Sequence, residues 1–317
     1  MSTTVSMPRI AWIGLGNMGR AMTTNIVNKS NAFTAPLVLY NRTTARAEAL
    51  SSSLPPGKTS VAYSIAEAIE QADIVFTIVS NDAAFEETVA KALQAPNGLK
   101  GKLLVGSSTI APETAMKMGQ MITEAGGEFL AMPVFGAAVA ADAGKLLCVP
   151  AGPKSCVDKV RPFLDGVMGR MTIDLSDESY DKALKLKILG NSFLFGMVES
   201  LSEAHVVAEK AGLGTDNLHK FIMGFFGGTS YEHYSARMVS GDYHKNKEPA
   251  FEASLARKDA GLNMKLAKSV GARMANVETA DARLVEVQKH ATDTGIKGDF
   301  IHMYGIIRAE AGLPFEN

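Results

Sequence analysis

Short apolar runs alternate with amphipathic stretches over roughly the first 175 residues of the chain. Asp73–Val79 is a near-continuous apolar run, which is typical of a parallel strand covered on both faces. Ser64–Glu67 has the pattern of a capping box, and Pro112 suits the first turn of a helix. Repeated strand–helix alternation predicts a doubly wound parallel sheet. The strands we expect are Arg9–Gly14, Leu37–Tyr40, Asp73–Val79, Leu103–Val105, Phe129–Val134 and Leu146–Val149.

The pattern changes after about Asp177. The segment Tyr180–Ala211 has apolar residues on nearly every face, which predicts one long buried helix, and Gly212 suits its C-terminal cap. Further helices are expected at Asp216–Phe226, Leu255–Val270 and Thr279–Thr292. The predicted fold class is therefore an α/β Rossmann-type doubly wound parallel sheet followed by an all-α domain. The predicted domains are residues 1–176 and residues 177–317, and the second begins with the long helix.

Composition and charge exclude several classes of protein. The formal net charge of −1 over 317 residues gives no electrostatic attraction to nucleic acid or to an anionic membrane. No apolar run reaches the ~18 residues that span a bilayer, and Met1–Met7 has no signal-peptide core. Cys148 and Cys156 are too few for a disulfide framework, which favours a cytoplasmic protein. The six histidines lack metal-ligand spacing, so no metal is expected.

A GxGxxG pattern follows the first predicted strand directly, in the segment IGLGNMG. In this strand–turn–helix context, the first glycine permits the tight turn and the second lets backbone approach a pyrophosphate. The third permits close helix–strand packing, and the helix N-terminus supplies oriented N–H groups. The loop thus predicts dinucleotide binding by Gly14, Leu15, Gly16, Asn17, Met18 and Gly19.

The second predicted strand ends in Tyr40-Asn41-Arg42-Thr43. NAD enzymes usually place an acid here to accept from the ribose 2′-hydroxyl, and this chain has none. The guanidinium of Arg42 can instead pair with a 2′-phosphate, and Asn41 and Thr43 offer further hydrogen bonds. We therefore expect NADP as cofactor, with NADPH preferred over NADH.

Lys187 and Asn191 stand four residues apart in the predicted long helix and so share one face. A buried lysine is costly unless it has partners or a chemical role. Burial and the positive charge of an oxidised nicotinamide would favour the neutral amine. Such an amine can exchange a proton with a substrate oxygen as hydride moves. The alternative is a lysine whose amine reaches solvent.

Several motifs in order along the chain resemble those of the β-hydroxyacid dehydrogenases, which include 3-hydroxyisobutyrate dehydrogenases and glyoxylate/succinic semialdehyde reductases. The resemblance covers essentially the whole chain and is carried by IGLGNMG, YNRT, GSSTIAP, MPVFGAAVAADAGKL, KILGN, AGLGTDNL and FEASLARKDAGL. It implies an active site in a cleft between a Rossmann domain and a helical domain that often dimerises, so a homodimer is expected.

The resemblance also implies roles for individual residues. Lys187 would be the general acid/base, with Asn191 as its hydrogen-bonding neighbour. Thr109 would lie near the nicotinamide ribose. Lys258, which we expect to contact the cofactor, and Asp259, which we expect to contact the substrate, match the Lys-Asp pair that closes over both.

The chain departs from the family's usual substrate motif, Asp-x-Pro-Val-Ser-Gly-Gly. Phe135 stands where a serine would help hold a substrate carboxylate, Ala137 replaces the second glycine, and Met132 replaces the acid. The predicted substrate contacts are Val134, Phe135 and Gly136, and the carboxylate requirement stays open. A second departure is Asp177–Ala183, where many relatives carry a Gly-x-Gly turn.

The leading hypothesis is an NADP-dependent oxidoreductase that moves hydride between nicotinamide and a small carbonyl compound or 3-hydroxy acid. An imine reductase on the same scaffold is the alternative within redox chemistry. Such enzymes generally lack the lysine, so Lys187 argues against that reading, while Phe135 argues mildly for it. A non-catalytic NADPH-binding sensor is the alternative from another class. A 6-phosphogluconate dehydrogenase is less well supported, because no basic cluster for a sugar phosphate is found.

Overall fold

The structure is a computed structural model, and it describes residues 7–317. Most of the segment Met1–Met7 therefore lies outside the described residues. The chain divides into two compact units, of which the first ends at Lys187 and the second begins at Ile188. This division lies inside helix α8 (Tyr180–Lys210), whereas the sequence-based boundary after residue 176 lies just before that helix. The boundary at 176 stays a prediction.

The first unit is built on an eight-stranded sheet with the order β11-β9-β6-β5-β4-β1-β2-β3. All neighbouring strands in it run parallel except β6 and β9. The chain builds outward from β1 to β3, returns to place β4 beside β1, and then builds outward the other way. This reversal confirms the predicted doubly wound fold, in which ligands bind at the carboxyl ends of the strands near the reversal. The strands are β1 (Arg9–Ile13), β2 (Thr34–Tyr40), β3 (Thr59–Val61), β4 (Ile74–Thr77), β5 (Leu103–Gly106), β6 (Glu128–Ala131), β9 (Ala151–Gly152) and β11 (Leu175–Ser176).

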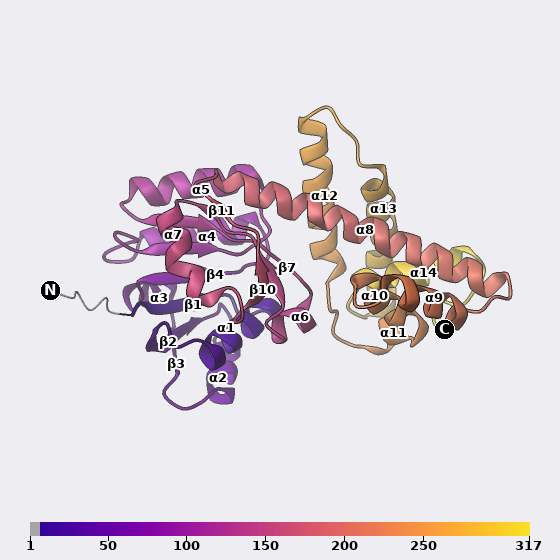
Figure 1. Cartoon of the computed structure of the whole chain (residues 1–317), viewed down its shortest axis with the longest axis horizontal. Helices are drawn as coiled ribbons and strands as arrows, with labels where there is room; N and C mark the ends of the chain where they lie inside the picture. The colour runs from indigo at the N-terminus through magenta and orange to yellow at the C-terminus, as the bar shows by residue number, and fades with distance from the viewer. Residues whose placement is uncertain (1–6) are drawn as a thin grey trace. The chain divides into compact units, whose positions relative to one another are not determined.

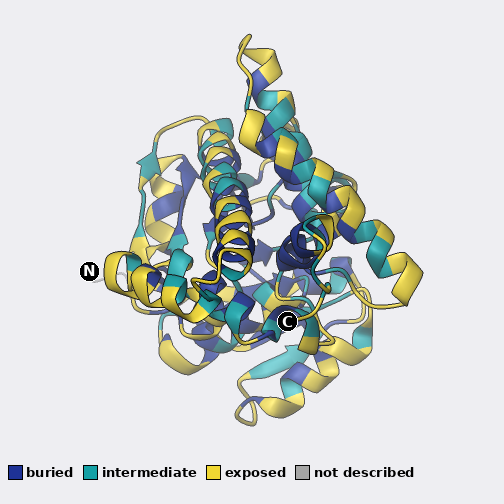
Figure 2. Ribbon diagram, turned by 90° about the vertical axis from the view of Figure 1, so that its right-hand side faces the viewer, coloured by how far each residue is buried: buried dark blue, intermediate teal, exposed yellow. Residues whose placement is uncertain are grey.

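Helices cover both faces of this sheet (Figure 1). Alternate residues of β1 point to opposite faces: Ile10 and Trp12 pack with α1 and α7, and Ala11 and Ile13 pack with α3, α4 and α5. Helices of the chain have buried residues along one side and exposed residues along the other (Figure 2). The helices are α1 (Asn17–Lys29), α2 (Thr44–Ser53), α3 (Ile65–Glu70), α4 (Asp82–Leu93), α5 (Pro112–Glu124), α6 (Ala138–Asp142), α7 (Lys154–Val160) and the short η1 (Arg161–Phe163).

A second sheet of three strands was not expected from the sequence. It has the order β10-β8-β7, from β10 (Gly169–Thr172), β8 (Leu146–Cys148) and β7 (Val134–Phe135). The predicted strand Phe129–Val134 is therefore wrong as one element, because β6 ends at Ala131 and β7 belongs to the other sheet. Pro133 separates them, and a proline cannot donate to a sheet ladder.

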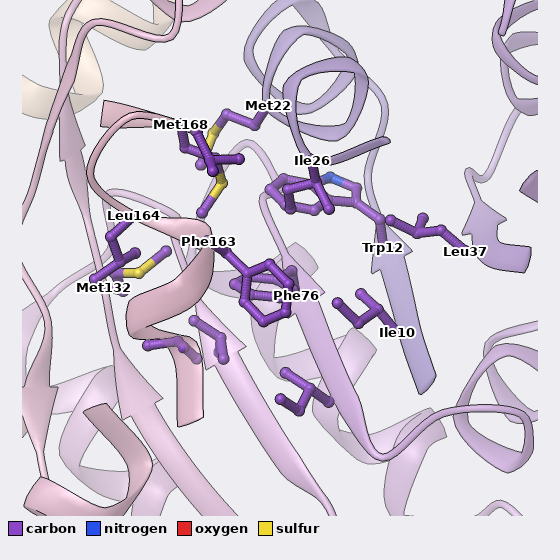
Figure 3. Packing of buried hydrophobic residues seen from close by; sticks show 14 of the residues in the cluster. Ile10, Trp12, Met22, Ile26, Leu37, Phe76, Met132, Phe163, Leu164 and Met168 are labelled. Carbon is purple, nitrogen blue, oxygen red and sulfur yellow. The ribbon is translucent and has the colours of Figure 1, made fainter. Parts of the chain in front are cut away.

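A cluster of buried aromatic side chains lies beneath α1 (Figure 3). Trp12 is fully buried and stacks on Phe76 with ring centroids 5.3 Å apart, and Phe76 meets Phe163 edge to face at 5.9 Å. Trp12 Nε1 also donates a hydrogen bond to the carbonyl of Gly14, 3.0 Å away. The loop between β1 and α1 thus rests on a rigid aromatic base.

The described residues of the second unit form helices and no strand, as predicted for an all-α domain. They comprise the greater part of α8, then α9 (Thr215–Phe226), α10 (Ser230–Val239), α11 (Asp242–Lys245), α12 (Ala253–Ser269), α13 (Ala275–Thr294), η2 (Phe300–His302) and α14 (Met303–Glu310). Gly212 follows α8 with a φ of +74°, so the predicted glycine cap is confirmed.

The prediction that the long helix is buried on every face is wrong. Phe193 on α8 is 80% exposed, and Leu189 and Val207 are exposed as well. A helix of 31 residues is roughly 46 Å long, which exceeds what the core of one small domain covers. The apolar positions of a helix therefore do not by themselves show which of them are buried by other parts of the same chain.

Neither a membrane-spanning helix nor a metal-binding group of side chains is present in the part of the chain that the structure describes. Within residues 7–317, no helix is long and apolar enough to cross a membrane. In the same range, no three side chains of histidine, cysteine, aspartate or glutamate are grouped so that they could hold a metal ion.

A buried serine in the second unit lies between two imidazoles. Ser235 Oγ is 2.8 Å from His205 Nε2 and 2.8 Å from His219 Nδ1, and both His205 and Ser235 are fully buried. Burial, and to a smaller extent the nearby charge of His219, lower the pKa of His205 to about 4. The folded chain therefore keeps His205 neutral in weak acid.

Acidification is expected to destabilise the protein through His205. The unfolded chain binds a proton on this side chain below about pH 6.5, whereas the folded chain does so only near pH 4. The stability that neutral His205 contributes is complete above about pH 6.5 and is lost as the pH falls toward 4, at roughly 1.4 kcal/mol per pH unit. Urea unfolding of wild type and His205→Gln between pH 7 and 4.5 measures this slope. Equal slopes in the two proteins would contradict the assignment.

Candidate active site

The loop between β1 and α1 has two glycines that the fold itself requires. Gly14 has a φ of +96°, and a Cβ there would lie 2.1 Å from the carbonyl oxygen of Ile78. A Cβ on Gly19 would lie 2.0 Å from the carbonyl oxygen of Gly14. By contrast, a Cβ on Gly16 would meet nothing within 4 Å. Gly16 is also the N-cap of α1, so its open side faces the helix N–H groups. That arrangement fits a pyrophosphate, which must approach the backbone of the loop closely.

Asn41 braces this loop from the end of β2. Its Oδ1 accepts a hydrogen bond from the backbone N–H of Leu15 at 2.9 Å, and its Nδ2 donates to the carbonyl of Thr43 at 3.0 Å. Gly14 N–H also donates to the carbonyl of Tyr40. The sequence placed Asn41 against the cofactor, whereas in the structure both polar atoms of its amide bind the protein. The hydrogen bonds of Asn41 therefore fix the conformation of the loop.

Arg42 and Thr43 are exposed at the carboxyl end of β2. Beside them lies the ion pair of Lys91 and Glu87 on α4, with 2.6 Å between Nζ and Oε1. Lys91 lowers the pKa of Glu87, and Arg42 lowers it further through its charge. The end of β2 thus has two cations and one acid around it, which suits an anionic group such as a 2′-phosphate.

The loops after β4 and β5 are joined by two residues that the sequence analysis did not single out. Ser108 Oγ accepts from the backbone N–H of Val79 at 2.7 Å, and Asp82 Oδ1 accepts from that of Ala111 at 2.8 Å. Thr109 is partly exposed between these braces. The signal that could have found them is a run of hydroxyl residues directly after a buried strand, where the carboxyl ends of parallel strands meet.

The predicted substrate residues lie on β7 and the turn that follows it. Val134 and Phe135 pair antiparallel with Cys148 and Leu147 of β8. Val134 is 5% exposed, so its side chain belongs to the core. Phe135 is partly buried, and Gly136 follows it with a φ of +130°.

Helix α6, directly after this turn, is fastened to the cofactor helix α1. Asn25 Nδ2 donates to the carbonyl of Ala141 at 2.6 Å, and Lys29 Nζ donates to that of Ala143 at 3.2 Å. Both α1 residues satisfy carbonyls at the C-terminal end of α6, which would otherwise lack partners. The substrate turn and the glycine loop are therefore held by one helix. Asn25 could not be identified from the sequence, because a buried asparagine inside a helix has no distinctive pattern.

The amine of Lys187 lies over the ring of Phe135, with 4.5 Å between Nζ and the ring centroid. Lys187 is neither fully buried nor fully exposed. An ammonium at this distance from an aromatic face is attracted by the negative face of the ring. The ring face thus offers the lysine ammonium an attractive contact.

In the second unit, Asn191, Lys258 and Asp259 converge. Asn191 Nδ2 donates to Asp259 Oδ2 at 2.7 Å, and Lys258 Nζ forms an ion pair with Asp259 Oδ1 at 3.1 Å. Asn191 and Asp259 are both buried, while Lys258 is partly exposed. A buried carboxylate needs such partners, because desolvation without them costs several kcal/mol. Asn191 is four residues beyond Lys187 on α8, so it continues the same helix face.

Models of known families match both parts of the chain. Residues 9–176 match the NAD-binding domain of 6-phosphogluconate dehydrogenase, and residues 182–305 match the family described as NAD-binding of NADP-dependent 3-hydroxyisobutyrate dehydrogenase. Together with the open glycine loop, these matches define the protein as a nicotinamide-dinucleotide-dependent oxidoreductase. The chain belongs to the β-hydroxyacid dehydrogenase family, as the resemblance indicated, and the comparisons support action on a CH–OH group or its oxidised form.

Individual relatives agree with this assignment over nearly their full lengths. An NADH-dependent oxidoreductase, ucdB, of Aspergillus ustus is 37% identical over 298 residues, which cover 94% of this chain and 98% of the relative. Glyoxylate/succinic semialdehyde reductase 1 of Arabidopsis thaliana is 28% identical, with 90% and 93% covered. The solved structure of 3-hydroxyisobutyrate dehydrogenase from Mycobacterium tuberculosis with L-serine has a TM-score of 0.77 at 25% identity and covers 95% of this chain and 99% of its own.

Proposed function

We propose that this protein reduces a small carbonyl compound with NADPH, and that Lys187 supplies the proton. The observation that carries the proposal is the amine of Lys187, which lies 4.5 Å from the ring centroid of Phe135 in the same unit as the glycine loop. When bound, the nicotinamide supplies hydride to the carbonyl carbon. The carbonyl oxygen then takes a proton from Lys187 Nζ, and the product is an alcohol. The reverse oxidation uses the same groups in the opposite order.

The remaining site residues have supporting parts in this proposal. Gly16 and the N-terminus of α1 hold the pyrophosphate, and Thr109 contacts the nicotinamide ribose. Asn191 hydrogen-bonds the reacting groups, and Asp259 holds the Asn191 amide in place. Lys258 adds a positive charge to the cofactor phosphates. Phe135 and Gly136 border the substrate. We also propose the cytoplasm as its compartment, because Cys148 and Cys156 are both free thiols.

Replacing Lys187 tests the reaction type. Lys187→Ala is expected to lower kcat by about 10²- to 10⁴-fold, because general acid catalysis contributes about that much. Carbonyl reduction is measured as NADPH oxidation with glyoxylate, succinic semialdehyde and a neutral aldehyde. Cofactor affinity is followed by the fluorescence of Trp12, the only tryptophan of the chain, and should stay unchanged.

Lys185→Ala is the matched control, because Lys185 is on the same helix and its amine pairs with Asp181. Near-normal turnover in Lys187→Ala would refute the mechanism. Turnover of a cyclic imine alone would favour the alternative of an imine reductase, to which the apolar Phe135 gives some support. NADPH binding without any turnover would favour a sensor.

The preference for NADPH rests on Arg42 and on the lack of an acid at the end of β2. Arg42→Ala is expected to raise KM for NADPH about tenfold or more and to leave KM for NADH nearly unchanged, because a hydrogen bond to a charged group contributes about 1.5–3 kcal/mol. Arg46→Ala, a neighbouring exposed arginine on α2, is the control. The Aspergillus ustus relative is named for NADH. Comparable dissociation constants of NADPH and NADH for the wild type would show that this chain shares that usage.

We also propose a homodimer that forms through the second unit. Exposed apolar side chains gather there on α8 and α9, and they include Phe193, Val207, Phe221 and Phe225. Phe221 and Phe225 stack on each other with centroids 5.8 Å apart. Val207 also lines an apolar groove of about 470 Å³ between α8 and the start of α9. Exposed apolar surface of this kind is typical of a face that a second copy covers.

A charge placed in the groove should separate the copies. Val207→Glu is expected to lower the dimer association constant at least about tenfold, because a two-fold interface buries the new charge twice. Sedimentation velocity at micromolar concentration measures this change. Tyr63→Glu, at an exposed position in the first unit, is the control. A wild type that sediments as a monomer would contradict the proposal, and an unchanged dimer in Val207→Glu would place the interface elsewhere.

A further inference from the structure

The ring of Phe135 is fixed from three sides. Its backbone pairs with Leu147 of β8, and its side chain packs against the core that lies under α3, α4 and α5. The next residue, Gly136, has a φ of +130°, and a Cβ on it would lie 2.7 Å from Leu146 Cδ2. The chain after the ring is therefore closed tightly against β8. Phe135 is a preorganised surface and not a mobile side chain.

The amine that this ring faces belongs to a flexible side chain. The lysine side chain has four rotatable bonds, and fixing them costs up to about 2 kcal/mol of conformational entropy. A general acid must nevertheless lie within hydrogen-bond reach of the atom it protonates. The ring face, 4.5 Å from Nζ, attracts the ammonium and so restricts where it lies. In the direction of carbonyl reduction, the ammonium is also the form that donates the proton.

The same ring changes what a substrate meets beside Lys187. A phenyl group has no hydrogen-bond donor. A carboxylate that moved from water to this ring would lose its hydration and gain no new hydrogen-bond partner from the ring. The serine of the family motif would offer a hydroxyl at this position. The methyl group of Ala137 further crowds the turn, which has two glycines in that motif. An uncharged substituent loses nothing at this surface and gains from apolar contact.

We infer that Phe135 positions the Lys187 amine for proton donation and selects aldehydes or ketones whose neighbouring substituent is uncharged over those that carry a carboxylate. This inference rests on the proposed lysine-dependent carbonyl reduction. Phe135 acts through Lys187 on the rate and directly on the substrate substituent, and each role has its own measurement.

The substrate preference is tested with two aldehydes of the same shape. Succinic semialdehyde and 4-methylpentanal differ in that an isopropyl group replaces the carboxylate. The wild type is expected to have a kcat/KM at least about tenfold higher for 4-methylpentanal, and Phe135→Ser should shift this ratio at least about tenfold toward the acid. An equal or higher kcat/KM for succinic semialdehyde in the wild type would overturn the selection role. So would an unchanged ratio in Phe135→Ser.

The positioning role is tested with Phe135→Leu and Phe135→Tyr on the neutral aldehyde. Leucine keeps an apolar surface but removes the ring face, so kcat should fall about 3- to 30-fold. The alkaline limb of the kcat profile should also move to lower pH, because the ammonium loses its attraction to the ring. Phe135→Tyr retains the ring, so its kcat and the position of its alkaline limb should be close to those of the wild type.

Two controls separate this inference from the proposed function. Trp12 fluorescence must give the same NADPH dissociation constant for every variant, which shows that each is folded and binds cofactor. Collapse of activity in Lys187→Ala, together with wild-type rates and pH profile in Phe135→Leu, would overturn the positioning role alone. Retained activity in Lys187→Ala would overturn the proposed function itself.

Discussion

The close approach of α1 to the end of β1 is the constraint on which the first unit depends. A side chain at Gly14 or Gly19 would overlap a backbone carbonyl, at 2.1 and 2.0 Å. Without both glycines, α1 could not begin against the sheet with its N–H groups open at Gly16. The Trp12 indole and the Asn41 amide then fix the loop from below and from the side. The phosphate cradle is thus a consequence of how helix and strand pack, and its rigidity comes from the core beneath it.

That constraint extends from cofactor to substrate through α1. The N-terminus of α1 points at the expected pyrophosphate, and Asn25 farther along it holds α6 and the turn after Phe135. A shift of α1 would therefore move both binding surfaces together. Hydride transfer requires the two reactants to be held at near-contact distance, so one shared support is an economical way to keep them in register. In the second unit, Asp259 has a similar role, since it orients Asn191 and holds Lys258.

The sequence predicted what depends on local pattern and on buried strands. The doubly wound sheet, the glycine turn and the long helix all have periodicity or spacing that a linear reading detects, while the roles of Lys187 and Asn191 stay predictions. The three-stranded sheet was missed because β7 and β10 are very short and pair with residues that are distant in sequence. The exposed side of α8 was wrongly predicted to be buried, because apolar character alone does not show what covers a side chain. Asn25, Ser108 and the ring contact of Phe135 depend on tertiary placement alone.

The departures from the family's substrate motif, and Phe135 above all, illustrate how chemistry can change while the scaffold is kept. The family motif would place polar atoms beside the lysine that we propose as proton donor, whereas this chain has a phenyl ring there, on a β7 strand that still pairs with β8. The ring both attracts an ammonium and repels an unsatisfied carboxylate, so one side chain affects the acid and the substrate at once. In the proposed function, the reaction type therefore depends on the retained lysine and glycine loop, while the substrate class depends on the residue beside the lysine. For this reason the substitution at Phe135 is more informative about the substrate than the overall identity to any relative.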